Sequence, residues 1–406
     1  MSAEPTAEEL ERYRERALAW LDAHAKPRRP GEESWADTAA AKAFQAELYA
    51  AGYVGIQWPR AYGGQGLTET HARIFAEASL RYDLPFLHFS IGLGMCAPTL
   101  LDLGTEEQKL RYVPPMLSGE TIWCQMFSEP NAGSDVAGLQ TKAVRIEAGW
   151  QLDGQKVWTS GAHYCDFGLI VARTDPSLPK HKGITMFVLD LTTPGVTIRP
   201  LRQITGNAHF NEIFLDSVVI PADAVVGEVN AGWAAAVLML GYERTSVGGW
   251  DWSKPASLTF AALRERMRAQ GRLDEQVVRR RLVDAFTAER MVEDLNLLHK
   301  AEWDAGIPTA QRGSVAKLAG SMQQDLSAEI AYELGGPELI EWPASDPDGG
   351  GLVLDAFQVI SSGIAGGSNE IQRNIIGERV LGLPAEPRVD RDLPFRELRV
   401  GGGTSA

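Results

Sequence analysis

The chain has 406 residues, of which 44% are hydrophobic, and a formal net charge of −14 at pH 7. Its length allows two or three domains with large cores, and the acidic balance argues against a general nucleic-acid surface. We find no C-x-x-C spacing among the three cysteines, no apolar run of the ~18 residues that a membrane span needs, and no secretory signal. We therefore expect a cytoplasmic chain without a metal site.

The first third of the chain is predicted to be helical. Thr6 and Glu9 form a capping-box pattern ahead of apolar residues at helical spacing, a second helix is expected over residues 35–51, and another begins at Thr105. Within this region Gly92-x-Gly94-x-x-Ala97 matches a dinucleotide-binding fingerprint. It follows no convincing strand, so we reject that interpretation.

From about Ile122 the apolar residues follow the period of strands. Asp153-Gly154 lies between two such runs and predicts a two-residue hairpin. Further strands are expected over residues 168–172, 184–191, 196–200 and 213–219. About six short strands with no helix between them predict a small barrel or sandwich.

After Gly232 the helical period returns, with helices expected over residues 233–249, 256–270, 275–304, 308–335 and 368–381. An order of helices, strands and helices disfavours a parallel doubly wound sheet. The predicted fold is multidomain α+β, with an N-terminal helical domain, a central β-barrel or sandwich domain, a C-terminal helical bundle and a frayed extension. These parts are expected at residues 1–121, 122–232, 233–384 and 385–406.

Three segments have residue patterns that suit a ligand, and each also has a plain structural interpretation. Residues 127–135, Phe-Ser-Glu-Pro-Asn-Ala-Gly-Ser-Asp, place hydroxyls and N–H groups on a loop that Pro and Gly shape, or they make a tight β connection. Trp158-Thr159-Ser160 can cover a planar ring and donate to its edge, or Trp158 can be a core residue. Residues 366–374 lead glycines into a helix whose first turn offers free N–H groups, or they form a simple hinge.

In order and spacing these segments resemble the acyl-CoA dehydrogenase family over about residues 8–383. One such match is weak, but five in order are specific. The supporting pieces are Trp58-Pro59-x-x-Tyr62-Gly63-Gly64, the Ser-Glu-Pro-x-Ala-Gly-Ser-Asp run at 128–135, Gly154-Gln155-Lys156-Val157-Trp158, Asp216-x-Val218-x-Ile220-Pro221 and Glu370-Ile371-Gln372-Arg373-Asn374.

The resemblance implies FAD, oxidation of an acyl-CoA thioester at its α and β carbons, and transfer of the electrons to an electron-transfer flavoprotein. It also implies an α–β–α subunit in a dimer of dimers. By position, the residues that it assigns to the cofactor are Gln125, Phe127, Ser128, Ser134, Trp158, Ser160, Ser368 and Glu370, with Ser134 also expected near the substrate.

The chemistry needs a carboxylate, because a positioned base must remove the α proton from a dry pocket. Most of the family places a Glu where this chain has Gly366. Isovaleryl- and long-chain-type members instead carry the Glu on the first long helix after the β domain, just before an Arg. Tyr242-Glu243-Arg244 lies at that place, so Glu243 is our candidate base and Arg244 the expected anchor near the substrate. The alternative is a plain solvent-facing charged pair.

The chain departs from the family where many homotetrameric members contact a neighbour's FAD. An R-x-x-F-G motif is replaced by Arg268-Ala269-Gln270-Gly271-Arg272, and a family Gln by Tyr332. Either a homo-oligomer holds FAD by other contacts, or an unlike partner supplies the missing ones, as in the similar actinobacterial steroid side-chain branch. That branch makes a bulky or branched acyl-CoA plausible. A non-catalytic partner subunit and an acyl-CoA oxidase are the rival interpretations.

Overall fold

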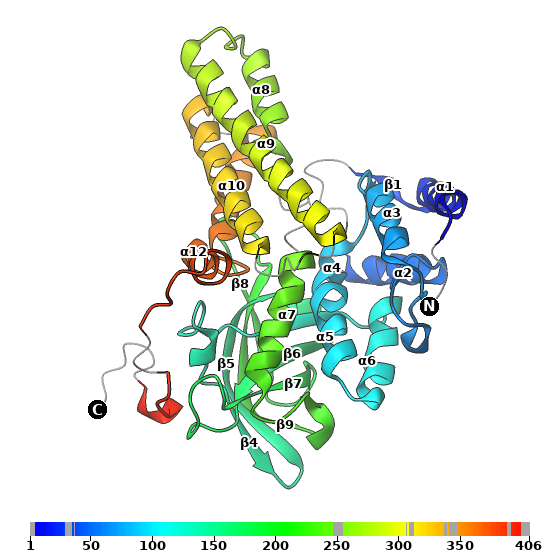
Figure 1. Ribbon diagram of the computed structural model, residues 1–406, viewed down its shortest axis with the longest axis vertical. Coiled ribbons are helices and arrows are strands. Elements are labelled where there is room, and N and C mark those ends of the chain that lie inside the picture. Colours follow the sequence, from blue (N-terminus) through cyan, green and yellow to red (C-terminus); the bar gives the residue numbers. More distant parts are fainter. Residues whose placement is uncertain are drawn as a thin grey trace. The chain divides into compact units, whose positions relative to one another are not determined.

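The computed structural model describes residues 5–28, 35, 37–246, 255–305, 307, 312–336, 339–340, 347–387 and 391–398 (Figure 1). The backbone divides into two compact units. Unit 1 comprises residues 1–202, 208–239 and 390–406, and unit 2 comprises residues 203–207 and 240–389. Hydrophobic core clusters occur in each of them.

Unit 1 begins with helices, and their starts follow the predicted caps. The helices are α1 (Ala7–His24), α2 (Thr38–Ala50), α3 (Glu69–Ser79), α4 (Phe86–Ile91), α5 (Ala97–Leu103) and α6 (Glu106–Ser118). The capping boxes of Thr6 with Glu9 and of Thr105 with Gln108 are both formed, which confirms those two predictions. In α1 the apolar face of Tyr13, Ala17 and Leu21 is buried.

The glycine pattern at Gly92 lies in a π turn, Gly92–Cys96, between α4 and α5. The pattern is therefore inside a helical stretch and not at a strand-to-helix turn, which supports its rejection as a dinucleotide fingerprint. By length and composition alone, the stretch Phe86–Leu103 could cross a membrane, contrary to our expectation. However, Cys96, Ala97 and Leu100 within it are fully buried, as in the core helix of a globular domain.

The centre of unit 1 is an eight-stranded sheet in the order β10-β7-β6-β4-β5-β9-β8, with β3 paired to β6. β3 is parallel to β6, whereas β6–β7, β4–β5, β5–β9 and β8–β9 are antiparallel pairs. The strands are β3 (Trp123–Met126), β4 (Lys142–Ile146), β5 (Gly149–Ser160), β6 (Phe167–Arg173), β7 (Ile184–Asp190), β8 (Val196–Leu201), β9 (Phe210–Ile220) and β10 (Val225–Val226). β6 and β7 are buried almost throughout, which explains their near-continuous apolar sequence.

The predicted hairpin at Asp153-Gly154 is wrong. These residues lie inside β5, where the pairing with β9 shifts register between Leu152 and Gly154. Gly154 has a φ of +154°, and a Cβ there would lie 2.6 Å from Thr141 Oγ1, so a glycine is needed for close packing and not for a turn. The hairpin closes six residues earlier, at residues 147–148 between the paired Ile146 and Gly149.

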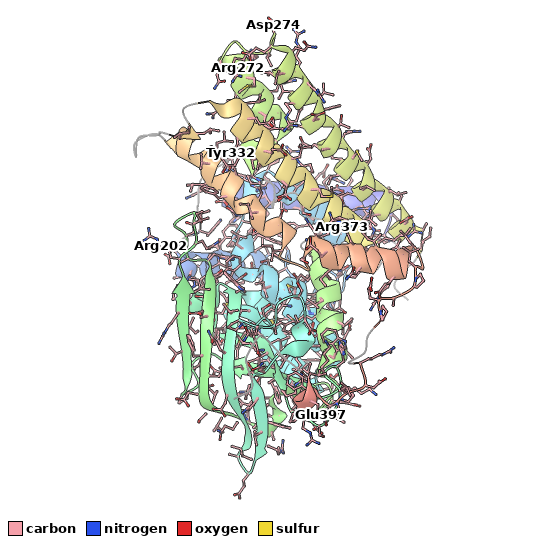
Figure 2. The ribbon with its side chains drawn as sticks, turned by 90° about the vertical axis from the view of Figure 1, so that its left-hand side faces the viewer. Arg202, Arg272, Asp274, Tyr332, Arg373 and Glu397 are labelled. Atoms are coloured by element: carbon pink, nitrogen blue, oxygen red, sulfur yellow. The ribbon has the colours of Figure 1, made fainter. Side chains whose placement is uncertain are left out.

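Unit 2 is helical. α7 (Gly232–Ser246) enters it from unit 1, and α8 (Phe260–Ala269), α9 (Gln276–Asp304), α10 (Gly313–Gly335), α11 (Pro347–Val359) and α12 (Asn369–Ile375) follow. α10 packs against α9, α11 and α12. Figure 2 shows Arg272 and Asp274 at the end of the bundle where α8 leads into α9. α11 was not predicted, because three glycines occupy its first half; its second half packs Leu352, Ala356 and Val359 into the core.

The C-terminal extension was expected to be frayed, and over residues 391–398 this expectation is wrong. We call this segment the C-terminal strap. It belongs to unit 1 and contains the short helix Phe395–Glu397. Backbone hydrogen bonds from Phe395 N to Leu178 O (2.9 Å) and from Arg396 N to Pro176 O (3.0 Å) fasten it to the connection between β6 and β7. Residues 388–390 and 399–406 lie outside the described part.

Candidate functional site

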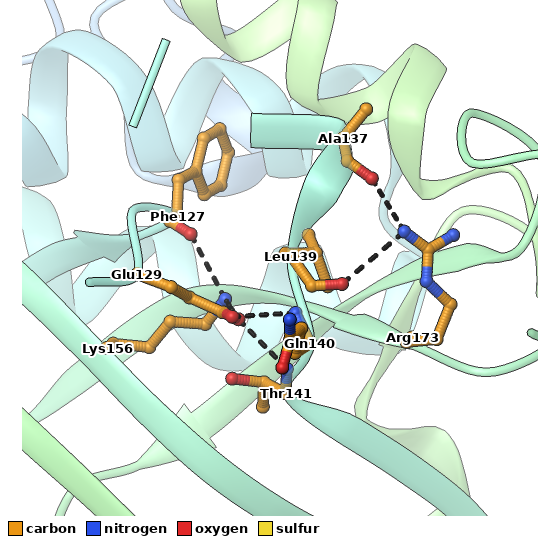
Figure 3. A network of polar contacts seen from close by, with 8 residues as sticks. All are labelled: Phe127, Glu129, Ala137, Leu139, Gln140, Thr141, Lys156 and Arg173. Carbon is orange, nitrogen blue, oxygen red and sulfur yellow. Dashed lines mark hydrogen bonds and ion pairs between the residues drawn. The ribbon is translucent and has the colours of Figure 1, made fainter. Parts of the chain in front are cut away.

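Residues 127–135, which we call the signature loop, follow the end of β3. The buried carboxylate of Glu129, within the loop, anchors it. Glu129 Oε1 lies 2.8 Å from Lys156 Nζ on β5, and the Lys156 side chain is fully buried. The backbone N–H groups of Gln140 and Thr141 donate to Glu129 at 2.6 and 3.0 Å, and Lys156 Nζ also donates to Phe127 O at 3.1 Å. Figure 3 shows this network, which fixes the beginning of the loop to the segment that follows it.

The contacts of Glu129 and Lys156 determine whether this buried pair is ionised. Burial would raise the pKa of Glu129, but Lys156 and the hydrogen bonds from Lys156, Thr141 and Gln140 outweigh it and lower that pKa below its usual value. Burial lowers the pKa of Lys156, and Glu129 opposes the shift. Three donor contacts to one carboxylate favour its charged form, so we take the pair as ionised at neutral pH.

The signature loop and the Trp158 segment lie together, as predicted. Val157 N donates to Ser128 O at 3.0 Å, which joins the loop to β5 one residue before Trp158. Trp158 is 60% exposed, with a φ of +62° that non-glycine residues seldom adopt, and its ring meets Phe210 edge-on at 5.9 Å. The interpretation of Trp158 as a core residue is therefore wrong. Ser160 ends the same strand and is half-buried.

The polar groups around the signature loop fit the edge of a flavin. Gln125, on β3 directly before the loop, has a buried Nε2 with no hydrogen-bond partner among the described residues, so a donor is available for a bound acceptor. Ser134 and Gly133 are exposed, and nothing lies within 4 Å of a Cβ built on Gly133. An exposed indole, an unpaired amide and serine hydroxyls are the groups that a planar, hydrogen-bonding ring requires.

In unit 2, Glu243 and Gly366 lie next to each other. A Cβ built on Gly366 would lie 3.4 Å from Glu243 Oε1. Glu243 lies near the C-terminal end of α7 and is half-buried, so it is not a plain solvent-facing residue. The carboxylate therefore occupies the space beside the position at which most of the family carries its glutamate. Arg244 follows in the same helix, and its side chain lies outside the described part.

Two buried or half-buried side chains hold the glycine turn before α12. Gly366 and Gly367 both have positive φ, +65° and +89°. Gln372 Nε2 donates to Gly366 O at 2.8 Å and to Gly367 O at 3.2 Å, and Lys317 Nζ on α10 donates to Gly367 O at 2.8 Å. Burial lowers the pKa of Lys317, while Glu370, Asp325 and Glu243 oppose that shift. Lys317 thus donates a hydrogen bond to the glycine turn, and its charge interacts with the Glu243 carboxylate.

The remaining predicted residues of unit 2 lie at the start of α12 and on α10. Ser368 is the N-cap and accepts from Ile371 N, whereas the Glu370 side chain is exposed. Ser368 and the N–H of Glu370 itself lower the pKa of Glu370. Tyr332, in place of the family Gln, is 43% exposed.

Sequence reasoning missed Lys156, Arg173, Lys317 and Gln372, although the first and last stand within quoted motifs. A lysine in the middle of a strand, Lys156, was the available signal, because a buried lysine needs a partner carboxylate. For Arg173 and Lys317 no signal was available, since their partners are backbone carbonyls far away in the sequence. In the part of the chain that the structure describes, no cluster of His, Cys, Asp and Glu could hold a metal ion.

Comparison with known families identifies the chain. It matches the models for the N-terminal, middle and C-terminal domains of acyl-CoA dehydrogenase over residues 7–120, 124–218 and 230–381. The chain belongs to the acyl-CoA dehydrogenase family. The resemblance drawn from its motifs, the three-domain architecture of a β-sheet domain between helical domains, and FAD as the cofactor are thereby confirmed.

Curated relatives from mycobacteria are similar to this chain. Acyl-CoA dehydrogenase FadE34 of Mycobacterium tuberculosis is 40% identical over 84% of this chain, which spans only 46% of that relative. Acyl-CoA dehydrogenase IpdE1 of Mycolicibacterium smegmatis is 36% identical over 85% of this chain and 88% of its own.

Solved structures give the same result. The steroid acyl-CoA dehydrogenase Tcur3481-Tcur3483 superposes with a TM-score of 0.79 at 27% identity, over 95% of this chain and 100% of that one. The ChsE4-ChsE5 complex of Mycobacterium tuberculosis has a TM-score of 0.74 at 28% identity, over 95% and 100%. These matches support the actinobacterial steroid-type branch of the family.

Proposed function

We propose that this dehydrogenase oxidises an acyl-CoA thioester to the trans-2-enoyl-CoA with Glu243 as the base that takes the α proton. The observation that carries the proposal is the 3.4 Å between Glu243 Oε1 and the Cβ position of Gly366. A carboxylate there can act for the glutamate that the chain lacks at Gly366. When bound, FAD supplies the acceptor for the hydride that leaves the β carbon. Hydrogen bonds to the thioester oxygen would stabilise the enolate-like charge.

The proposed cofactor contacts are those that the family resemblance assigns. Gln125, with its unpartnered amide, carries the most direct support for a hydrogen bond to the flavin. The exposed Trp158 indole offers a face against the ring system. Arg244 and Ser134 are the proposed substrate contacts. The full set of proposed cofactor residues is Gln125, Phe127, Ser128, Ser134, Trp158, Ser160, Ser368 and Glu370.

We further propose a bulky or branched acyl group, since structural relatives are described as steroid acyl-CoA dehydrogenases. An unlike partner subunit is proposed as well, because two of these relatives are named as pairs and the chain lacks the R-x-x-F-G motif. Electrons would pass to an electron-transfer flavoprotein in the cytoplasm. The rivals are a non-catalytic subunit that completes another chain's FAD site, and an acyl-CoA oxidase.

The test is anaerobic flavin reduction with a panel of acyl-CoAs, from short branched to steroid-derived, with and without candidate partner subunits. Bleaching of the flavin in the chain alone would eliminate the partner-only rival, and peroxide without an added acceptor would favour the oxidase. Glu243→Gln should slow bleaching by about 10²–10⁴-fold. Glu265→Gln, which changes an exposed glutamate of the same unit, is the control and should leave the rate unchanged. An unchanged rate in Glu243→Gln would refute the assignment of the base.

A further inference from the structure

We propose that the C-terminal strap is a positioning element for the signature loop, and that it acts through Arg173 and Lys180. The inference rests on the proposed function, because it assigns the strap a role in FAD binding. The strap lies beyond residue 381, where the match to the C-terminal family domain ends.

The first step in the argument is the attachment of the strap. Its two backbone hydrogen bonds go to Pro176 O and Leu178 O, and Pro394 forms an isolated β-bridge with Pro179. All three contacts are with one segment, residues 174–183, which connects β6 to β7. The strap therefore restrains this connection at residues 176–179.

The second step is the contact between Phe395 and Arg173. The guanidinium carbon of Arg173 lies 3.7 Å from the centre of the Phe395 ring, and Arg173 is only 4% exposed. Cation–π attraction is strongest where the cation is shielded from water. Burial lowers the pKa of Arg173 to about 10, while Glu129 and Asp135 oppose the shift, so the guanidinium is charged at neutral pH. The aromatic ring of the strap covers a cation that has little water around it.

The third step leads from Arg173 to the signature loop. Arg173 Nη2 donates to Ala137 O at 2.6 Å and to Leu139 O at 3.4 Å, directly after the loop (Figure 3). Its Nη1 donates to Lys180 O at 2.7 Å, and Lys180 Nζ pairs with Asp135, the last residue of the loop, at 3.0 Å. The guanidinium thus holds the exit of the loop both directly and through Lys180.

Together these contacts restrain the signature loop at both of its ends. Glu129 and Lys156 fix its beginning, whereas Arg173 and Lys180 fix its exit. Phe395 holds Arg173 in its place from the other side. Since the proposed flavin contacts Ser128 and Ser134 lie between these ends, loss of the strap should disorder the loop before it affects the rest of the sheet.

The experiment compares Phe395→Ala, Phe395→Leu and removal of residues 390–406 with wild type. Amide hydrogen exchange of residues 127–141 in the FAD-free protein is the first measurement, and the dissociation constant of FAD from fluorescence titration is the second. We expect about tenfold faster exchange in the loop and about tenfold weaker FAD binding for Phe395→Ala. Phe395→Leu keeps an apolar side chain but loses the ring, so it should show most of the same effect.

Glu397→Ala is the matched control, because Glu397 is exposed in the same short helix and should change neither measurement. If the truncated protein fails to fold, the two point variants decide. Unchanged loop exchange in Phe395→Ala and Phe395→Leu, or the same acceleration in Glu397→Ala, overturns the proposal. Exchange is read without substrate, so a chain that binds FAD but oxidises no acyl-CoA would refute the proposed function and leave this result standing.

Discussion

Gly366 stands where most of the family carries a glutamate. The carboxylate of Glu243, on α7, lies beside this position. The glycine is not free to change. Its φ of +65° suits glycine, and both neighbouring carbonyls are held by Gln372. The turn therefore keeps its conformation, although the glutamate that most of the family carries at this position is absent.

An exchange of the two positions tests this relationship. Glu243→Gly should reduce the rate of flavin bleaching by about 10²–10⁴-fold, and adding Gly366→Glu should recover part of it, because the new carboxylate starts beside the vacated space. Recovery should be incomplete, since a non-glycine residue at positive φ costs about 1–2 kcal/mol. Stopped-flow measurement of bleaching gives the rates, and Gly366→Ala reports the backbone strain alone. A double variant no faster than Glu243→Gly would contradict the prediction.

Lys317 should influence both the turn and the base. We expect Lys317→Met to lower the rate of bleaching about tenfold, because Gly367 O loses the shorter of its two hydrogen bonds and Glu243 loses a nearby cation that favours the ionised carboxylate. The loss of the cation should move the acid limb of the pH–rate profile to higher pH. Arg373→Gln removes an exposed cation of α12 and should leave that limb in place. An unmoved limb in Lys317→Met would count against the coupling to Glu243.

At the scale of elements, the sheet shows what the sequence could and could not predict. Strand positions followed from the apolar period, and β6, β7, β8 and β9 lie where expected. The position of the hairpin turn could not be predicted, because Asp153-Gly154 has the composition of a turn but lies at a β-bulge within β5. There Asp153 accepts from Ser217 N at 2.7 Å on the neighbouring strand. Side-chain partners across a sheet are set by tertiary contacts, which local patterns do not contain.

The Glu129–Lys156 pair should behave as a unit. Glu129→Gln and Lys156→Met each leave the other group buried without its partner, so each should reduce the free energy of unfolding by about 3–5 kcal/mol. The double variant should lose much less than the sum of the two. Urea denaturation of the full chain, fitted over its first transition, supplies these values. Additive losses would show that the two side chains act independently.

The same pair has a defined pH dependence. The folded-state pKa of Glu129 is below its ordinary value of 4.5, so its contribution is present above pH 4.5 and is lost as the pH falls through the lower folded-state pKa. Wild type should therefore lose stability more steeply than the Glu129→Gln/Lys156→Met variant below pH 4.5. Thermal unfolding as a function of pH measures the difference, and parallel profiles would contradict it.

At the scale of the whole molecule, α9 carries an exposed apolar face. Its large side chains recur at helical spacing, with Phe286 and Leu297 at 50% and 61% exposure; the set is Val283, Phe286, Met291, Leu297 and Leu298. Patches of this kind are typical of interfaces. Light scattering after size-exclusion chromatography should give a mass above that of one 44.2 kDa chain, alone or with its partner subunit. Phe286→Lys/Leu297→Lys should lower that mass.

The three-part order of helices, strands and helices could be predicted from the sequence, because apolar periods and caps are local properties. The proposed base, Glu243, could be located only by reference to the family, and its nearness to Gly366 depends on how α7 meets the turn before α12. The expectation for the C-terminus failed for a similar reason. Residues 391–398 alternate charged residues with proline and single apolar residues and show no clear period, so nothing local distinguishes a docked segment from a loose one.

The place of the strap in the chain has a consequence for synthesis. Unit 1 is assembled from residues 1–202 and 208–239 together with the strap, and all of unit 2 is translated in between. The Phe395 ring is therefore synthesised after the whole of unit 2. The signature loop gains this restraint only once unit 2 has been translated, and a chain that stops before residue 390 has the β sheet without the restrained loop.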